Sequence, residues 1–142
     1  MSLDPADRVV FHLSLPVLDL GEAKAFYCRV LGATVGRENA AWADILLFGH
    51  QLTLHQRPDE VLPPEKTGVR HFGAILSWQD WEALAARLGA KGIRFLRPPT
   101  VHGAGTPREH GKLVLADPSG HVIELKAYRD MGAVFGMLGP PA

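Results

Sequence analysis

The stretch VFHLSL at residues 10–15 decides the fold, because a second stretch of the same form, VRHFGA, stands at residues 69–74. Each has a histidine at its third position, and these two histidines, His12 and His71, lie 59 residues apart. Two later stretches also correspond, GHQLTLH at 49–55 and GHVIELK at 120–126, which lie 71 residues apart. The Pro/Gly-rich stretch 98–111 can hold the twelve extra residues. The chain is therefore predicted to contain one module twice.

The bulk composition indicates a single globular domain with no nucleic-acid or membrane partner. The 142 residues can bury a sizeable core, and 15 basic residues balance 15 acidic ones. No cluster of Lys and Arg is interleaved with aromatics, the first eight residues do not resemble a signal peptide, and no apolar run could span a bilayer. We expect a cytoplasmic protein that acts on a small molecule.

Each half has the pattern of a β-α-β-β-β module. The first half contains a β-compatible strand at 9–18, a helix from the cap Asp19 to Gly32, and strands at about 33–38, 42–48 and 51–57. The second half contains a strand at 69–76, a helix capped by Ser77, strands at 93–97, 112–116 and 121–128, and a long loop at 98–111. The prediction is an α+β fold in which modules 9–57 and 69–128 form one cup-shaped mixed sheet, joined by linker 58–68. The apolar tail 129–142 is expected to dock on the body or on a second subunit.

Period-two alternation separates an apolar, helix-packing face from a polar face in four of these strands. A face exposed only to solvent would also be polar, but the repeat places a histidine at one equivalent point in each module. The facing positions are His12 and Ser14, then Gln51, Thr53 and His55, then His71 and Gly73, and finally Glu124, Lys126 and Tyr128. Two imidazoles and a carboxylate form the ligand set of non-haem Fe(II) oxygenases. His12, His71 and Glu124 are therefore the predicted ligands of one divalent ion, with Fe(II) favoured and Mn, Zn, Ni or Co as alternatives.

These motifs resemble those of the vicinal oxygen chelate superfamily, which includes glyoxalase I, bleomycin-resistance proteins, fosfomycin-resistance enzymes and extradiol catechol dioxygenases. The similarity rests on the opening strand, on AFYCRVLG at 25–32, and on the ending DPSGHVIE at 117–124. The resemblance implies ligand places on the first and last strand of each module, which here are His12, Thr53, His71 and Glu124.

Two positions depart from the family's patterns. Glyoxalase-like members have a glutamate where this chain has Thr53, and extradiol dioxygenases have a tyrosine where it has Val114. The first departure counts against a typical glyoxalase reaction, and the second counts against a typical catechol cleavage. The set of two histidines and one glutamate is similar to that of the extradiol dioxygenases and of the fosfomycin-type transferases. The resemblance therefore favours an Fe(II) extradiol-type dioxygenase acting on a catechol-like vicinal diol. Two alternatives stay open: a glyoxalase, lyase or thiol transferase using another metal, and a non-catalytic binding module for a small aromatic ligand.

Further polar residues are candidates for proton transfer and substrate contact. His55 is an acid/base candidate, with a fourth-ligand role or a solvent-facing position as alternatives. His110 on the 98–111 loop and Tyr128 are the other catalytic candidates, while Ser14, Thr53, Gly73 and Lys126 are candidates for binding the substrate. A homodimer is expected, and the cup could be built within one chain or by exchange of modules between two.

Overall fold

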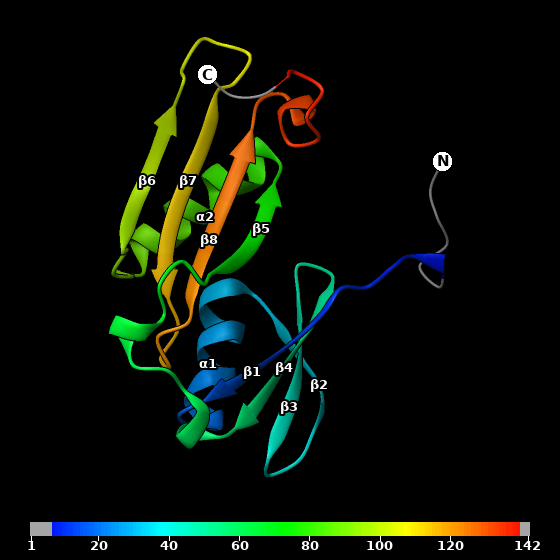
Figure 1. Cartoon of the computed structure of the whole chain (residues 1–142), viewed down its shortest axis with the longest axis vertical. Helices are drawn as coiled ribbons and strands as arrows, with labels where there is room; N and C mark the ends of the chain where they lie inside the picture. The colour runs from blue at the N-terminus through cyan, green and yellow to red at the C-terminus, as the bar shows by residue number, and fades with distance from the viewer. Residues whose placement is uncertain (1–6, 140–142) are drawn as a thin grey trace. The chain divides into compact units, whose positions relative to one another are not determined.

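The computed structural model describes residues 7–139, and the chain divides into two compact units (Figure 1). The first unit comprises the chain up to Lys66 together with Asp117–Gly120, and the second comprises Thr67–Ala116 and the chain from His121 onward. The boundary between Lys66 and Thr67 falls inside the predicted linker 58–68, which contains two short 3-10 helices, Pro58–Glu60 and Pro64–Lys66.

The first unit has the predicted β-α-β-β-β order. Its elements are β1 (His12–Val17), α1 (Leu20–Leu31), β2 (Thr34–Glu38), β3 (Trp42–Leu47) and β4 (His50–Gln56). The strands form one sheet in the order β1-β4-β3-β2, in which β1 runs parallel to β4 and the other neighbours are antiparallel. Buried side chains of α1, among them Ala23 and Tyr27, and of the sheet, among them Ile45 and Leu54, form the core of this unit.

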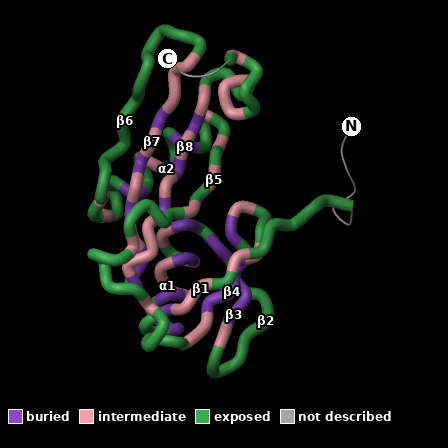
Figure 2. Tube along the Cα trace, in the orientation of Figure 1, coloured by how far each residue is buried: buried purple, intermediate pink, exposed green. Residues whose placement is uncertain are grey.

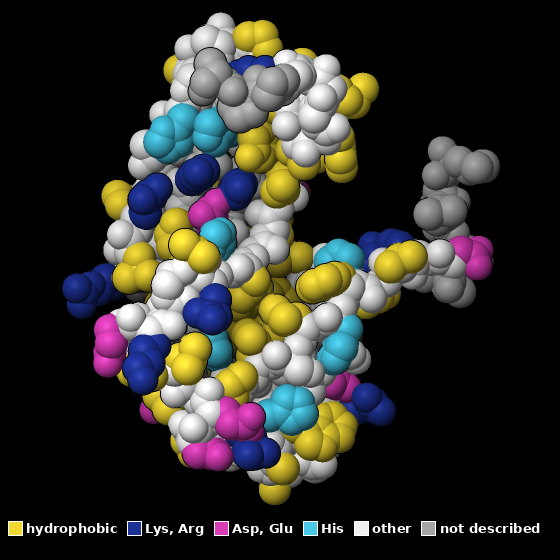
Figure 3. All heavy atoms as spheres, in the orientation of Figure 1, with side chains coloured by type: hydrophobic (Ala, Val, Ile, Leu, Met, Phe, Trp, Pro, Cys, Tyr) yellow, Lys and Arg dark blue, Asp and Glu magenta, His cyan; other side chains and the backbone are white. Residues whose placement is uncertain are grey.

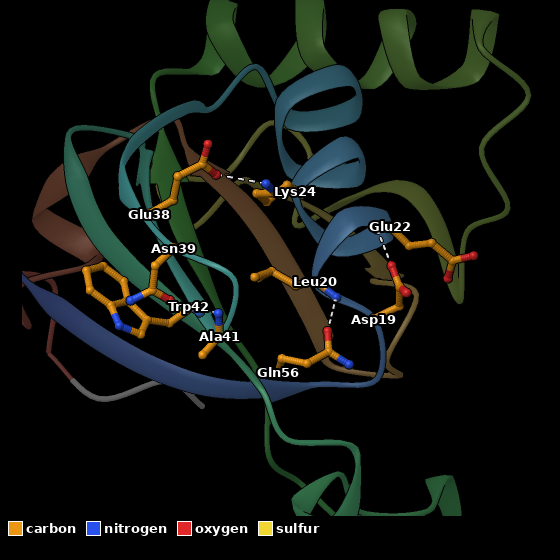
Figure 4. A network of polar contacts seen from close by, with 9 residues as sticks. All are labelled: Asp19, Leu20, Glu22, Lys24, Glu38, Asn39, Ala41, Trp42 and Gln56. Atoms are coloured by element: carbon orange, nitrogen blue, oxygen red, sulfur yellow. Dashed lines mark hydrogen bonds and ion pairs between the residues drawn. The ribbon is translucent and has the colours of Figure 1, made fainter.

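Local hydrogen bonds explain where α1 and the β2–β3 turn begin and end (Figure 4). Asp19 caps the helix, because its carboxylate accepts a hydrogen bond from the backbone N–H of Glu22. Gly32 ends the helix in the left-handed conformation, at φ 74°, which glycine adopts without a Cβ clash. The Asn39 side chain accepts from the backbone N–H groups of Ala41 and Trp42 and so closes the turn. The predicted cap and stop of this helix are both confirmed.

The second unit repeats the arrangement of the first. It contains β5 (Phe72–Leu76), α2 (Trp78–Ala90), β6 (Arg97–His102), β7 (His110–Ala116) and β8 (Val122–Tyr128), with strand order β5-β8-β7-β6. The parallel pair is β5 and β8, equivalent to β1 and β4. Ser77 caps α2 as predicted, by accepting from the backbone N–H of Asp80. The α+β prediction of two β-α-β-β-β modules is confirmed.

Burial alternates strictly along β7 and β8, as Figure 2 shows. Every second side chain faces α2 and is fully buried, and the residues between them are half-buried on the opposite face. The fully buried set is Leu113, Leu115, Ile123, Leu125 and Ala127. This alternation confirms the predicted division of these strands into an apolar and a polar face.

The strand before β7 was predicted in the wrong place. The prediction was a strand at 93–97 and a loop at 98–111, but β6 runs from Arg97 to His102 and β7 already begins at His110. The dipeptide Pro98-Pro99 suggested a loop, because proline cannot donate a ladder hydrogen bond. Here β6 is the edge strand, and its register shifts between Arg97 and Thr100, so the two prolines are tolerated.

The turn at 117–120 belongs to the first unit, where it contacts α1. The buried hydroxyl of Tyr27 donates a 2.7 Å hydrogen bond to Asp117, and the Oγ of Ser119 accepts from the backbone N–H of Leu18. Burial, with Asp117 beside it, raises the pKa of the Tyr27 phenol, so this group stays protonated.

The described part of the tail, up to residue 139, packs on the second unit of its own chain. Docking on the body of the protein was one of the two predicted alternatives. The Arg129 guanidinium lies 3.7 Å from the ring centroid of Trp78 and 3.3 Å from the Glu109 carboxylate. The Arg108 guanidinium donates a 2.6 Å hydrogen bond to the Leu138 carbonyl. Residues 140–142 of the predicted tail lie outside the described residues. Within residues 7–139 no helix has the length and apolar character that crossing a membrane requires.

Candidate functional site

The register of the parallel strand pairs makes the two modules equivalent residue by residue. In the first unit Ser14 pairs with Thr53, and in the second Gly73 pairs with Glu124. His12 stands two residues before Ser14, and His71 stands two residues before Gly73. The correspondence predicted from the repeat, His12 with His71 and Thr53 with Glu124, is therefore present in the strand pairing.

His71 and Glu124 lie together in the second unit. The Nε2 atom of His71 is 3.7 Å from a carboxylate oxygen of Glu124, while its Nδ1 lies 2.6 Å from the Val69 carbonyl. A carbonyl at this distance accepts a hydrogen from Nδ1, which leaves the lone pair on Nε2, the atom that faces Glu124. A backbone acceptor behind the imidazole is the usual way in which proteins orient a metal-binding histidine. These two side chains fit a divalent cation.

Glycine is required beside Glu124 for steric reasons. A Cβ on Gly73 would lie 1.6 Å from the Glu124 carbonyl oxygen, far inside van der Waals contact. The backbones of β5 and β8 therefore approach at this point more closely than any other residue would permit. Gly73, predicted as a substrate contact, thus has a clear structural function: it lets the two strands pair beside the Glu124 carboxylate.

Two lysines and a row of three rings occupy the same face of β6, β7 and β8. Lys112 and Lys126 are directly opposite in the ladder, and the Nζ of Lys126 lies 3.2 Å from Glu124. Two residues further along both strands, His110 is opposite Tyr128. The His110 ring stacks on the rings of Tyr128 and His102, with centroid separations of 5.3 and 5.2 Å. Figure 3 shows Lys and Arg side chains gathered beside the histidines over these strands.

The predicted position of His110 on the 98–111 loop was therefore wrong. His110 begins β7, and its Nδ1 lies 2.8 Å from the Arg108 carbonyl, so the ring is held between its two neighbours. Tyr128, at the end of β8, faces the same side as Glu124, in agreement with the period-two prediction. Val114 is directly opposite Glu124, and this is the position where the resemblance led us to expect a tyrosine in extradiol dioxygenases.

In the first unit Thr53 is bound to a carboxylate that the sequence analysis missed. The Thr53 hydroxyl donates a 2.8 Å hydrogen bond to Asp44, whose other oxygen accepts at 3.0 Å from Arg37. Asp44 and Thr53 are cross-strand partners, and both are buried. The hydrogen bond from Thr53, with the Arg37 guanidinium beside it, holds the pKa of Asp44 below its usual range. A charged residue within the apolar stretch WADILLF at 42–48 was the available signal.

The other predicted residues of the first unit lie on the same face as Thr53. The Nε2 atom of His12 is 3.3 Å from the Ser14 hydroxyl. His55 lies two residues beyond Thr53 in β4, where it is opposite Pro16 of β1 and Trp42 of β3. Within the described residues, no group of three His, Cys, Asp or Glu side chains stands close enough together to hold a metal ion.

A cleft of about 540 Å³ adjoins Glu124 in the second unit. Its polar lining consists of His71, Glu124 and Lys126, and Ile75 of β5 contributes apolar surface. Its other wall comes from the tail, through Met131, Val134 and Phe135. The cleft thus combines one carboxylate, one imidazole and one ammonium group with an apolar wall, which suits a small amphipathic molecule.

Comparison with known proteins identifies the family of the chain. Residues 9–125 match the Glyoxalase/Bleomycin resistance protein/Dioxygenase superfamily. The chain belongs to this superfamily. The match spans both β-α-β-β-β modules almost completely, so membership rests on the whole duplicated pattern and not on one motif. The resemblance inferred from the sequence is confirmed.

Among curated proteins, the chain is similar to two enzymes of different types. It is 30% identical to a catechol-2,3-dioxygenase of Bacillus subtilis over 87% of its own length, but it spans only 42% of that protein. It is 28% identical to the glutathione transferase FosA of Serratia marcescens over 80% of its own length and 77% of that protein's.

Two solved structures illustrate the range of the fold. A glyoxalase/bleomycin resistance protein/dioxygenase from Alicyclobacillus acidocaldarius is 31% identical and has a TM-score of 0.79, with 92% of this chain and 97% of that chain covered. The fosfomycin resistance protein FosX of Listeria monocytogenes has a TM-score of 0.66 at 18% identity, with 84% and 93% covered. The second similarity concerns the fold alone.

Proposed function

We propose that this protein is a metal-dependent enzyme whose single divalent ion is held by His12, His71 and Glu124. The observation that carries the proposal is the pairing of His71 with Glu124, because the Val69 carbonyl directs the free lone pair of the imidazole toward the carboxylate. An imidazole and a carboxylate oriented in this way are donors that Fe(II), Mn, Zn, Ni and Co all accept, and Fe(II) is favoured for a set of two histidines and one carboxylate.

The choice of His12 as third ligand rests on the duplicated register. It occupies in the first module the position that His71 occupies in the second, and its face is the one that carries Ser14 and Thr53. Thr53 cannot act as an anionic ligand, and its hydroxyl hydrogen is engaged by Asp44. Three protein ligands rather than four are therefore proposed.

The first candidate reaction is extradiol-type ring cleavage of a catechol-like vicinal diol. Its support is the similarity to a catechol-2,3-dioxygenase, which extends over most of this chain. A bound Fe(II) ion would supply Lewis acidity and open coordination positions for two neighbouring substrate oxygens and for O₂.

The chain's own residues are proposed to bind the substrate and move its protons. The apolar wall of Met131, Val134 and Phe135 receives the ring of the diol, and Lys126, which lines the same cleft, is a proposed substrate contact. Tyr128 and His110, whose rings are stacked, and His55 on the other unit are the proposed proton-transfer groups. Ser14 and Thr53 remain proposed substrate contacts, and Gly73 provides the close strand approach beside Glu124.

The second candidate is a thiol transfer to an anionic substrate. It is favoured by the two facing lysines, Lys112 and Lys126, which offer more positive charge than a neutral diol needs. The similarity to a glutathione transferase FosA, with 77% of that protein covered, supports the same alternative.

Metal content and two activity assays test the proposal. The purified protein is stripped with a chelator, reloaded anaerobically with Fe(II), Mn, Zn, Ni or Co, and analysed for bound metal per chain. Oxygen uptake with a panel of catechols tests ring cleavage, and loss of free glutathione in the presence of fosfomycin tests thiol transfer. A protein that binds none of these metals would refute the enzyme proposal and leave a binding module.

Two further properties belong to the proposal. The protein is proposed to be a homodimer, because the tail exposes the large apolar side chains Phe135 and Met137. It is proposed to act in the cytoplasm, for which the single cysteine, Cys28, is suitable because that compartment is reducing.

A further inference from the structure

The second unit places two lysines at directly opposed positions of an antiparallel strand pair. Lys112 of β7 and Lys126 of β8 are direct cross-strand partners, so their side chains emerge side by side on the half-buried face. Like charges at directly opposed positions destabilise an antiparallel pair. Glu124 lies 3.2 Å from Lys126 and offsets part of this repulsion. The Glu124 carboxylate offsets one of the two lysine charges, so the three side chains together keep a net positive charge.

A bound divalent metal ion and a diol chelating it through two deprotonated oxygens would not change this balance, because the negative charge of the diol would equal the positive charge of the ion. The Glu124 carboxylate would still offset the charge of only one of the two lysines. A net positive charge therefore stays available for a further anionic group of the substrate.

The surroundings of the lysine pair suit an acid on an apolar or aromatic body. On one side lies the stack of His110 and Tyr128, two residues along each strand from the lysines. On the other side Lys126 lines the cleft of about 540 Å³, whose opposite wall is formed by apolar tail residues. Both the flat rings and the apolar wall bind carbon skeletons, while the lysines between them bind a charged substituent.

We propose that Lys112 and Lys126 form an anion subsite and that the substrate carries a carboxylate or phosphonate in addition to its chelating oxygens. The inference rests on the proposed function, whose substrate class it narrows from catechol-like diols in general to those bearing an acidic group. The same subsite would bind a phosphonate if the thiol-transfer candidate is correct.

Ligand binding to the metal-free protein tests the subsite independently of catalysis. Isothermal titration compares catechol with 3,4-dihydroxybenzoate, and methylphosphonate with an uncharged alcohol of similar size. The two acids are expected to bind about tenfold more tightly than their neutral counterparts, as charge-assisted hydrogen bonds to lysine provide. Preference for dihydroxybenzoate indicates a carboxylate substrate, and preference for methylphosphonate indicates a phosphonate.

Lys112→Gln is the variant that tests the subsite alone, because Lys126 also contacts Glu124, which is a proposed metal ligand. This substitution is expected to remove most of the preference for acids while leaving the number of bound metal ions unchanged. Lys91→Gln, at the end of α2 in the same unit, is the matched control and is expected to keep the preference. Equal binding of acids and neutral ligands, or a preference that survives Lys112→Gln, would overturn the inference.

The two proposals fail in different ways. A protein that prefers acids but binds no divalent metal refutes the proposed enzyme and keeps the subsite. A protein that binds metal and shows no preference for acids refutes the subsite and keeps the enzyme.

Discussion

Removing the hydroxyl of Thr53 is expected to weaken the first unit while leaving metal binding intact. Thr53 stands at the module position that Glu124 occupies in the second unit, yet its hydroxyl donates to the buried carboxylate of Asp44 at 2.8 Å. Thr53→Val is the most informative change, because valine has nearly the same shape and lacks only the donor. Thr53→Ser is the matched control, since it keeps the hydroxyl and removes the methyl group.

The size of the effect follows from the burial of both partners. Asp44 and Thr53 are 3% and 7% exposed, so water cannot replace the lost donor. A hydrogen bond to a charged group contributes about 1.5–3 kcal/mol, and Thr53→Val is expected to lower the free energy of unfolding by about 2 kcal/mol. Thr53→Ser removes one buried methyl and is expected to cost about 0.8 kcal/mol.

The pH dependence of the stability lost in Thr53→Val shows whether the ionised Asp44 carboxylate is responsible for that loss. The pKa of Asp44 is lower in the folded protein than in the unfolded chain, and the Thr53 hydrogen bond is the largest reason. The ionised carboxylate therefore stabilises the fold above the unfolded value of about 3.9, and this stabilisation disappears as the pH falls through the lower folded value. The difference between wild type and Thr53→Val is expected to be full at pH 7 and to shrink below about pH 4.

Chemical denaturation at several pH values, with metal analysis of each variant, is the assay. A Thr53→Val protein as stable as wild type at pH 7 would show that the hydrogen bond from Thr53 to Asp44 does not contribute to the free energy of unfolding. A deficit of equal size at pH 7 and pH 3 would show that the ionised carboxylate is not involved. Loss of the metal in this variant would mean that Thr53 is a ligand.

Three further outcomes are expected. His12→Ala and Glu124→Ala each abolish metal binding but keep the far-ultraviolet circular dichroism of the wild type, because neither side chain packs against a helix; metal retained by both variants would contradict the ligand set. Gly73→Ala lowers the free energy of unfolding by about 2 kcal/mol or more in thermal denaturation, since its Cβ would collide with the Glu124 carbonyl. The control Gly89→Ala in α2, where nothing lies within 4 Å of the added Cβ, is neutral or stabilising in the same assay. Light scattering at micromolar concentration gives the mass of a dimer, and a monomeric mass would refute the proposed assembly.

Most of the fold was predictable because its signals are local. The carboxylate of Asp19 and the hydroxyl of Ser77 cap the helices that their positions indicated. The period of two placed Glu124 and Tyr128 on one face of β8, and the strand register confirms this. Repetition supplied the remaining information, since an equivalent histidine in each module is difficult to explain by chance.

The errors concern properties that depend on neighbouring strands. The prolines at 98 and 99 indicated a loop, but whether a strand can include proline depends on whether it lies at the edge of its sheet. Asp44 was missed because its partner Thr53 is nine residues away and becomes its neighbour only when β3 pairs with β4.

The amino-acid pattern was thus sufficient to predict the duplicated module, the helix boundaries and the face on which each candidate ligand lies, since all three follow from the residue's own strand or helix. The hydrogen bond between Thr53 and Asp44, the stack of His110 on Tyr128, and the opposition of Lys112 and Lys126 emerged with the folded sheets. Alternation within a strand specifies which way a side chain points, but its lateral neighbours depend on strand order and register, which long-range backbone pairing sets.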